Sequence, residues 1–181
     1  MSTITPADIV SFWREAGPDK WFDQDAAFDL AIREEFLAVH EAAARGEHAA
    51  WEDSAEGALA LIILFDQFPR NMFRGSPHAF ATDALARAVA RRAIAAGFDQ
   101  AIDANMRQFF YLPFMHSEFL ADQDRCVALY GKLGDPDLSK YATGHRDIII
   151  KFGRFPHRNR VLGRDTTEAE QEFLDGGGFG G

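Results

Sequence analysis

The sequence predicts an all-α protein, because apolar residues recur at helical spacing and the signals of β-hairpins do not occur. Ile9, Val10, Phe12 and Trp13 form such a stripe near the N-terminus. Capping residues, glycines and prolines separate this stripe from later ones, as helix starts and stops do. No run of alternating apolar and polar residues is followed by a hairpin turn. We therefore expect one all-α domain over residues 1–175, with about eight antiparallel helices, followed by a flexible glycine-rich tail over residues 176–181.

Caps and helix breakers predict the order of these helices. Thr5 can cap a helix that has Pro6 in its first turn. Near the other end of the chain, Thr167 and Glu170 form a capping-box pattern for a short last helix. The expected helices run from Thr5-Pro6 to Gly17, after Asp23 to about Arg45, from about Ser54 to Phe68, from about Ala79 to Ala96, from Asp103 with a kink or split at Pro113, from Asp122 to Leu133, from Leu138 to Phe152, and from Thr167 onward.

The third of these helices is expected to be the central one. It is apolar nearly all round, which is typical of a helix that is buried on every side. Asp53 and Glu56 resemble a capping box before it. Pro69 is expected to stop it, because proline has no N–H to donate and clashes with the preceding turn.

Charge is distributed unevenly along the chain. The net charge of the 181 residues is −9, yet the stretch from His145 to Arg164 holds six Arg and Lys residues against one Asp. An acidic remainder disfavours general binding to nucleic acid or membranes, because both need a basic face. The basic stretch therefore indicates a local anion-binding site.

Cysteine usage and hydropathy predict a cytoplasmic protein. Cys126 is the single cysteine, so no disulfide can form within the chain. The N-terminus lacks the pattern of a signal peptide. The longest apolar run, Ala58–Phe65, is much shorter than the roughly 20 residues that span a bilayer.

Two segments with the pattern Phe-x-x-Phe-Pro followed by a basic residue are the main candidates for a ligand site. The first, Phe65–Arg70, contains Asp66, a carboxylate on a helix that should be buried and that therefore needs a partner. Arg70 is near in sequence, and Arg154 or Arg158 of the second segment is an alternative partner. Arginine and asparagine side chains suit a carboxylate or phosphate ligand, but they can equally cap a helix end. The predicted ligand-binding residues are Asp66, Arg70, Asn71, Arg74, Arg146, Arg154, Arg158 and Asn159.

Histidines supply the candidates for proton transfer. His157 lies in the second segment, in a turn, and histidine titrates near neutral pH. His116 and His145 are further candidates. His116 and Glu118 are two residues apart, a poor spacing for two metal ligands on one helix, where a spacing of four is useful. We therefore expect no metal site and no cofactor.

Three long blocks of the sequence resemble a known family. They are LIILFDQFPRNMFRGSPHAFATD, FFYLPFMHSE and HRDIIIKFGRFPHRNRVLGRDTTEAEQEFL. Together they are similar to the mainly bacterial family called domain of unknown function 924. The resemblance implies a tetratricopeptide-like array of helical hairpins, although no 34-residue consensus repeat is visible in the sequence. It implies no particular activity.

Three functions remain open at this point. The first is a helical binding module with an Arg/Asn/His-lined pocket for a carboxylate, a phosphate or a peptide. In that case the two Phe-x-x-Phe-Pro segments form one pocket; the alternative is that they form only an ion-paired clamp. The second is a small-molecule enzyme that uses a histidine as general acid or base and arginines to anchor an anionic substrate. The third, RNA binding through arginine and phenylalanine stacking, is disfavoured by the acidic remainder of the chain.

Overall fold

A computed structural model of the protein describes residues 4–178, and none of these lies in a β-strand. The predicted all-α class is therefore confirmed for the described part of the chain. The chain divides into two compact units. Unit 1 comprises Met1–Arg74 and His78–Pro113, and unit 2 comprises Gly75–Pro77 and Phe114–Gly181. The predicted single domain stays a prediction, as does the flexible tail, whose residues 179–181 lie outside the described residues.

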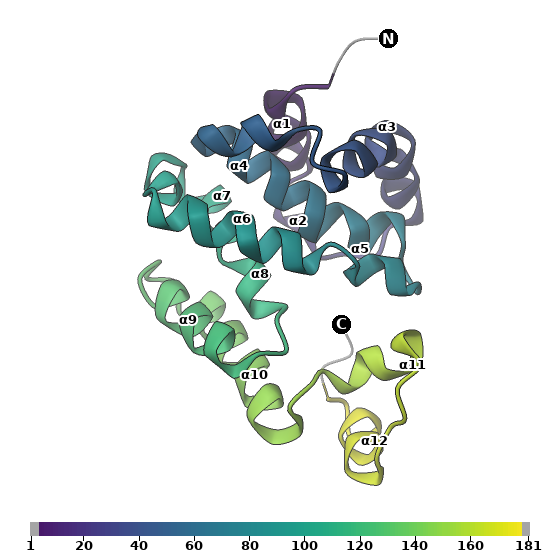
Figure 1. The fold of residues 1–181 in the computed structure, drawn as a ribbon. Coiled ribbons are helices and arrows are strands. Elements are labelled where there is room, and N and C mark those ends of the chain that lie inside the picture. The colour runs from purple at the N-terminus through teal and green to yellow at the C-terminus, as the bar shows by residue number, and fades with distance from the viewer. Residues whose placement is uncertain (1–3, 179–181) are drawn as a thin grey trace. The chain divides into compact units, whose positions relative to one another are not determined.

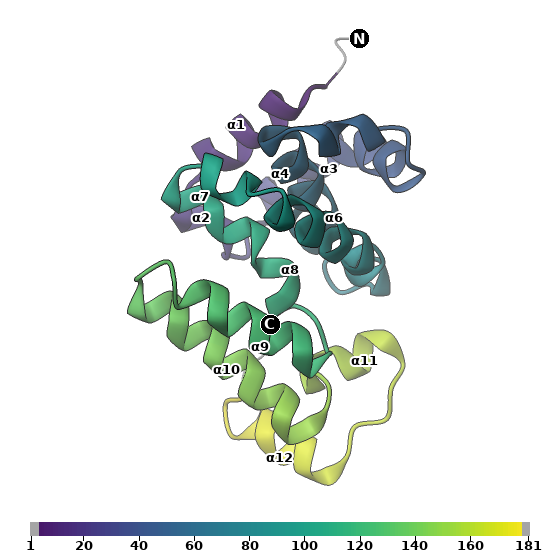
Figure 2. The ribbon, with the colours of Figure 1, turned by 60° about the vertical axis from the view of Figure 1, so that its left-hand side comes forward.

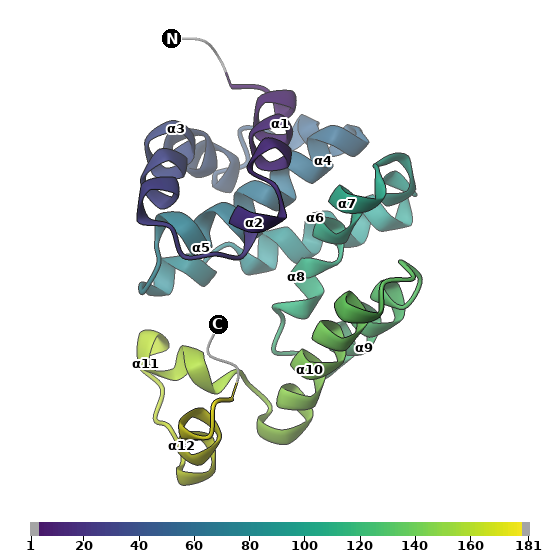
Figure 3. The same cartoon turned by 180° about the vertical axis from the view of Figure 1, so that it is seen from behind.

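Unit 1 is built from helices that pack around α4. Figure 3 shows α1 and α2 nearest the viewer, with α4 behind them. Its α-helices are α1 (Pro6–Ala16), α2 (Pro18–Trp21), α3 (Ala26–Ala44), α4 (Ala55–Ile62), α5 (Phe68–Met72), α6 (Asp83–Ala95) and α7 (Ala104–Arg107). Short 3₁₀ segments, η1 (Ala49–Asp53), η3 (Pro77–Phe80, which begins in unit 2), η4 (Phe98–Ala101) and η5 (Gln108–Phe110), and one π-helical turn, η2 (Ile63–Gln67), connect them.

The core of unit 1 confirms that the third predicted helix is central. α4 packs against α1 and α6, and all six residues from Gly57 to Ile62 are buried. Trp13, Phe36 and Phe68 form an aromatic cluster beside it, with ring centroids 4.7 Å apart for Phe36 and Phe68. Burial of side chains this large supplies most of the favourable free energy of folding.

Two details of this central helix differ from the prediction. Ser54, not Asp53, is the N-cap residue, and its hydroxyl accepts a hydrogen bond from the backbone N–H of Gly57. Pro69 does not stop the helix, because α5 continues it to Met72. Pro69 is in the first turn of α5, where a missing N–H is tolerated.

Unit 2 contains the second Phe-x-x-Phe-Pro segment. Figures 1 and 2 show α9 and α10 side by side in this unit. Ile148, Ile149 and Phe155 form a buried core with Phe152 and Phe173 packed against it. The helices of this unit are α9 (Leu120–Tyr130), α10 (Pro136–Phe152), η6 (Pro156–Arg158), α11 (Asn159–Leu162) and α12 (Glu168–Asp175), while α8 (Leu112–Met115) straddles the boundary between the units.

Local caps were predicted better than helix lengths. The predicted N-cap at Thr5 and the predicted capping box at Thr167 are both present, and Thr5 also forms a capping box with Asp8 that was not predicted. By contrast, the predicted helix from Ala79 begins only at Asp83, and the Pro113 region is broken into several short helical segments. The described helices are consequently more numerous than the eight expected.

Candidate functional site

In the first Phe-x-x-Phe-Pro segment, backbone carbonyls lose their usual helical partners. The N–H of Phe68 bonds to the carbonyl of Ile63 in the π-turn, which releases the carbonyl of Leu64. Pro69 has no N–H for the carbonyl of Phe65. Because buried carbonyls need hydrogen-bond donors, side chains take over these places.

Side chains from other helices, and one from the same segment, supply the missing donors. His40 Nδ1 lies 2.8 Å from the carbonyl oxygen of Leu64, and the hydroxyl of Thr82 donates to the carbonyl of Phe65 at 2.7 Å. Arg70 donates to the carbonyl of Asp66. Neither role was predicted, because the π-turn that releases the carbonyl of Leu64 is not visible in the sequence, and Pro69 alone does not indicate which side chain lies near the carbonyl of Phe65.

The buried carboxylate predicted at Asp66 is confirmed, and its side chain is fully buried. Arg70 Nη1 lies 3.4 Å from Asp66 Oδ1, and Arg70 also donates two hydrogen bonds, 3.1 and 3.2 Å long, to Asp83. Burial opposes the charge of Arg70, but Asp66 and Asp83 outweigh it and raise the pKa of the guanidinium. Arg70, one of the arginines considered as partners of Asp66, is thus in contact with it, and Asp83 on α6 shares the same guanidinium.

Asn71 and Arg74 are likewise held by a carboxylate of the protein. Asp29 on α3 accepts a hydrogen bond from Asn71 Nδ2 at 2.8 Å, and bonds from Arg74 Nε and Nη2 at 2.8 and 2.9 Å. This bidentate geometry is the one that arginine makes with a carboxylate ligand. Here the carboxylate comes from α3, so the contact joins α3 to the end of α5.

The second Phe-x-x-Phe-Pro segment has a different backbone. α10 ends at Phe152, and Gly153 adopts a left-handed conformation with φ 68°. Phe155 is extended, and Pro156 begins η6. The extended conformation of Phe155 is the one that a following proline favours.

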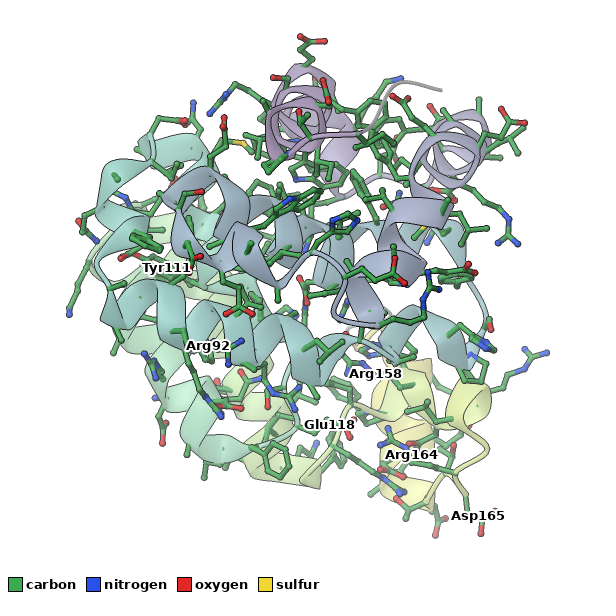
Figure 4. All side chains as sticks on the ribbon, turned by 45° about the horizontal axis from the view of Figure 1, so that its top comes forward. Arg92, Tyr111, Glu118, Arg158, Arg164 and Asp165 are labelled. Atoms are coloured by element: carbon green, nitrogen blue, oxygen red, sulfur yellow. The ribbon has the colours of Figure 1, made fainter. Side chains whose placement is uncertain are left out.

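Glu118 and Arg164 fix this segment at Phe155. The backbone N–H of Phe155 donates to Glu118 Oε1 at 2.8 Å, and the carbonyl of Phe155 accepts from Arg164 Nη2 at 3.0 Å. Glu118 and Arg164 form a bidentate ion pair with distances of 2.7 and 3.0 Å, which can be followed in Figure 4. Burial opposes the charge of Glu118, but the hydrogen bonds from Arg164 and from the Phe155 N–H together outweigh it and lower the pKa of Glu118. Sequence analysis weighed Glu118 only as a companion of His116 and so missed this role.

Arg154 and Asn159 both donate hydrogen bonds to Glu170 in unit 2. Arg154 donates to both oxygens of Glu170 at 2.6 and 2.8 Å, and the Asn159 amide donates to Glu170 at 3.2 Å. Asn159 also accepts from Arg164 Nε at 2.9 Å. The hydrogen bond from Arg154 is the main reason that the pKa of Glu170 falls to about 2.

Arg146 makes only loose ionic contacts. Its guanidinium nitrogens lie 3.7 Å from Asp124 and 3.9 Å from Asp147. These distances are longer than hydrogen bonds, and both aspartates are exposed. Pairs of this kind contribute little to stability.

Three of the remaining candidates, His145, His157 and Arg158, gather around one aromatic ring, that of Phe155. Ring centroids lie 5.7 Å apart for Phe155 and His145, and 5.6 Å apart for Phe155 and His157. The guanidinium carbon of Arg158 lies 4.6 Å from the centroid of the same ring. We call Phe155, His145, His157 and Arg158 the Phe155 cluster. It joins three residues predicted for the site with one, Phe155, that the prediction used only as part of the motif.

Both histidines of the Phe155 cluster are held neutral. Burial lowers the pKa of His157 to about 3, with further lowering by Arg158 and His145. Burial also lowers the pKa of His145 to about 4, and His116 and Arg158 add to the effect. His116 is therefore close enough to both to influence them. An anion bound beside these rings would act in the opposite direction and stabilise their protonated forms.

The described residues show where the potential metal ligands and the one cysteine lie. Among residues 4–178, no group of three or more His, Cys, Asp or Glu side chains is arranged to hold a metal ion. Cys126 is buried, and burial raises the pKa of its thiol. A thiol of this kind is unreactive at neutral pH.

The fold and the site define an all-α protein in which ion pairs fix two proline-containing segments. A family model described as "Bacterial protein of unknown function (DUF924)" matches residues 9–178, so the chain belongs to this family, as the resemblance indicated. A solved structure of a protein of unknown function from Agrobacterium tumefaciens is similar to it, with 52% sequence identity and a TM-score of 0.92 over 94% of this chain and 97% of that one. No curated protein matches the chain. No helix in the described part is both long and apolar enough to cross a membrane.

Proposed function

We propose that the protein is a helical binding domain that recognises a small acidic ligand at the Phe155 cluster. The observation that carries this proposal is the gathering of His145, His157 and Arg158 on one buried ring. Imidazole and guanidinium groups are the donors that bind carboxylates and phosphates. All three groups pack against the same ring, and packing of this kind reduces the entropy lost when a ligand binds.

The other predicted ligand-binding residues are better explained as architecture. Arg70 holds Asp66 and Asp83, Arg74 holds Asp29, and Arg154 holds Glu170. A ligand would have to displace a well-placed carboxylate in each case. We therefore assign ligand recognition to unit 2 and an ion-paired clamp to the first Phe-x-x-Phe-Pro segment. A pocket shared by the two segments stays a prediction.

The alternative of an enzyme has less support. General acid–base catalysis at neutral pH works best with a group whose pKa lies near 7. The pKa values of His157 and His145, about 3 and about 4, are far below this range. Both rings can hold a hydrogen bond at neutral pH, which suits binding.

The tetratricopeptide-like array and the cytoplasmic location belong to the same proposal. α9 and α10 pack together with a short connection between Tyr130 and Pro136, as the two helices of a hairpin do. The single, reduced cysteine fits a cytoplasmic protein. The acidic balance of the chain disfavours nucleic acid as the ligand.

Thermal unfolding in the presence of anions tests the proposal. Phosphate, sulfate, malonate and succinate form the panel. A ligand at a hundred times its Kd stabilises the folded state by about 2.7 kcal/mol, which raises the Tm of a chain of this size by roughly 5–10 °C. We expect at least one anion of the panel to produce such a shift.

Two variants and one control assign the shift to the cluster. Arg158→Ala and His157→Gln should each abolish the anion-dependent shift. Arg160→Ala removes the same charge from an exposed arginine on the same segment and should leave it unchanged. The proposal is wrong if no anion shifts the wild-type Tm, or if a folded Arg158→Ala variant retains the full shift. Should Arg158→Ala not fold, His157→Gln decides the question alone.

A further inference from the structure

We infer that the outer face of α3 binds a second copy of this chain, through antiparallel pairing of the two α3 helices about a two-fold axis. This inference goes beyond the proposed function and is independent of it, because α3 lies in unit 1 and the Phe155 cluster lies in unit 2. It depends on an open stripe along α3, on two opposite charges within that stripe, and on the order in which its residues follow one another.

α3 presents two different faces. Figures 1 and 3 show this helix at the edge of unit 1. The buried residues follow one side of the helix: Phe28, Ile32, Phe36, Val39, His40 and Ala43. A second stripe, which we call the α3 stripe, has members three or four positions apart: Leu30, Arg33, Glu34, Leu37, Ala38 and Glu41. Because successive residues of an α-helix are about 100° apart, the α3 stripe is centred roughly 160° from the buried side.

The α3 stripe lines an open hollow with a volume of about 540 Å³. All the lining residues belong to α3, so no other element among residues 4–178 forms a second wall. Leu30 is 55% exposed near one end of the stripe, and Leu37 lies seven residues further along. A single exposed leucine is ordinary on a protein surface. Leucines seven positions apart on one side of a helix, however, form the pattern by which helices pack against each other.

Two opposite charges lie between these leucines. Arg33 Nη1 donates a hydrogen bond of 2.9 Å to the carbonyl of Met72, and the guanidinium lies 5.5 Å from the ring centroid of Phe73. These contacts position the arginine without giving it a negative partner. Within the described part of the chain, neither Arg33 nor Glu34 forms an ion pair. By contrast, several other arginines of unit 1 each pair with a carboxylate: Arg14, Arg45, Arg70, Arg74 and Arg92.

The α3 stripe is complementary to itself when one helix is reversed. If a two-fold axis passes between Arg33 and Glu34, two residues face each other when their numbers add up to 33 + 34 = 67. Leu30 then faces Leu37 of the second copy, and Arg33 faces Glu34 of the second copy. The symmetry repeats both contacts, as in any isologous interface. Glu41, at the end of the stripe, faces Ala26 and gains no ionic partner.

Charge complementarity also selects the orientation of the two helices. A parallel pairing would bring Arg33 against its own copy and Glu34 against its own copy. Like charges placed opposite each other cost several kcal/mol in an interface, about enough to exclude that arrangement. The antiparallel pairing replaces both repulsions by attractions, and it covers the four leucines at the same time.

The interface should be weak, because a single stripe on each copy takes part. α3 has 19 residues and is therefore about 28 Å long, at 1.5 Å per residue. One pair of helices of this length buries less than the roughly 1,600 Å² of a standard interface, which places it among weak, reversible contacts. We therefore expect a Kd of about 10–100 μM, at which monomer and dimer exchange with concentration.

Sedimentation equilibrium of the full chain, from about 5 μM to about 500 μM, tests the inference. The mass should rise from 20.2 kDa toward twice this value. Arg33→Glu and Glu34→Arg each place like charges opposite each other and should weaken association at least tenfold. In an equimolar mixture of the two variants, opposite charges face each other again at both positions. The mixture should therefore associate within threefold of the wild type.

Glu35→Arg is the matched control. It makes the same charge change as Glu34→Arg at an exposed neighbour outside the α3 stripe, and it should associate as the wild type does. A wild-type mass of 20.2 kDa over the whole range would overturn the inference. So would a Glu34→Arg variant that associates normally, or a mixture of the two folded variants that stays monomeric. If Arg33→Glu, which also loses the hydrogen bond to Met72, does not fold, Leu30→Glu takes its place and must weaken association at least tenfold.

Discussion

The two Phe-x-x-Phe-Pro segments have the same pattern but different backbones. In the first, Phe68 is helical and the chain passes through Pro69 without leaving the helix. In the second, Phe155 is extended and Pro156 begins a new 3₁₀ turn. A proline therefore does not decide by itself whether a helix continues.

One register position explains much of this difference. The residue after the first phenylalanine is Asp66 in the first segment and Gly153 in the second. Gly153 has φ 68°, a left-handed conformation that glycine adopts without the steric cost of a Cβ. Asp66 stays helical, and its buried carboxylate pairs with Arg70 one turn later. The first segment therefore contains an ion pair that holds a continuous helix, whereas the second forms a turn that contains His157 and Arg158.

Loss of the buried carboxylate should have the largest effect on stability. Asp66→Ala leaves the partly buried charge of Arg70 with less compensation, and we expect a loss of about 3–5 kcal/mol in the free energy of unfolding, measured by urea denaturation. Asp147→Ala, at an exposed carboxylate, should change it by less than about 0.5 kcal/mol. Equal effects of the two substitutions would contradict the stabilising role of the ion pair between Asp66 and Arg70.

The two histidines of the Phe155 cluster, His145 and His157, should make stability depend on pH. Because the pKa values of His145 and His157 are lower in the folded state, the unfolded state binds more protons below its own pKa of about 6.5. The contribution of these two histidines to the free energy of unfolding is therefore fully present above pH 6.5 and is lost as the pH decreases toward 4. Each histidine should contribute a slope that approaches 1.4 kcal/mol per pH unit. Denaturation of His145→Gln and His157→Gln between pH 7 and 4 should show a shallower slope, and a slope identical to that of the wild type would exclude this origin.

The carbonyl of Phe65 offers a way to test the role of Pro69. Thr82→Val removes the hydroxyl that donates to this carbonyl and should cost about 1–3 kcal/mol, since a buried acceptor loses its donor. Pro69→Ala supplies a backbone N–H at the position that usually donates to it. We expect the double variant to be more stable than the sum of the single effects predicts, as measured in a double-mutant cycle. Strict additivity would mean that the new N–H does not reach Phe65.

The glycine of the second segment should give the smallest effect. Gly153→Ala places a Cβ in a left-handed conformation, which costs about 1–2 kcal/mol. No neighbouring atom lies within 4 Å of that Cβ, so the loss should come from the backbone alone. Gly144→Ala, within α10 and also without a close neighbour, should instead be neutral or stabilising in the same urea experiment.

The sequence by itself determined the all-α class, the N-cap at Thr5, the capping box at Thr167 and the central place of the helix that follows Ser54. These features depend on residues within a few positions of one another, so hydrogen bonds and apolar periodicity along the chain are sufficient to predict them. It also indicated Asp66 as a buried ion and the basic stretch from His145 to Arg164 as a candidate site.

Only the tertiary structure decided which partner each charged side chain takes. Asp29 holds Arg74 from 45 residues away, and Glu118 holds Arg164 from 46. Several carboxylates in the sequence could pair with each arginine. Coulomb attraction depends on the distance between the charges in space, which the sequence alone does not give. The backbone around Pro69 belongs to the same group, because the open carbonyls of Leu64 and Phe65 find partners in His40 of α3 and in Thr82, the N-cap residue of α6.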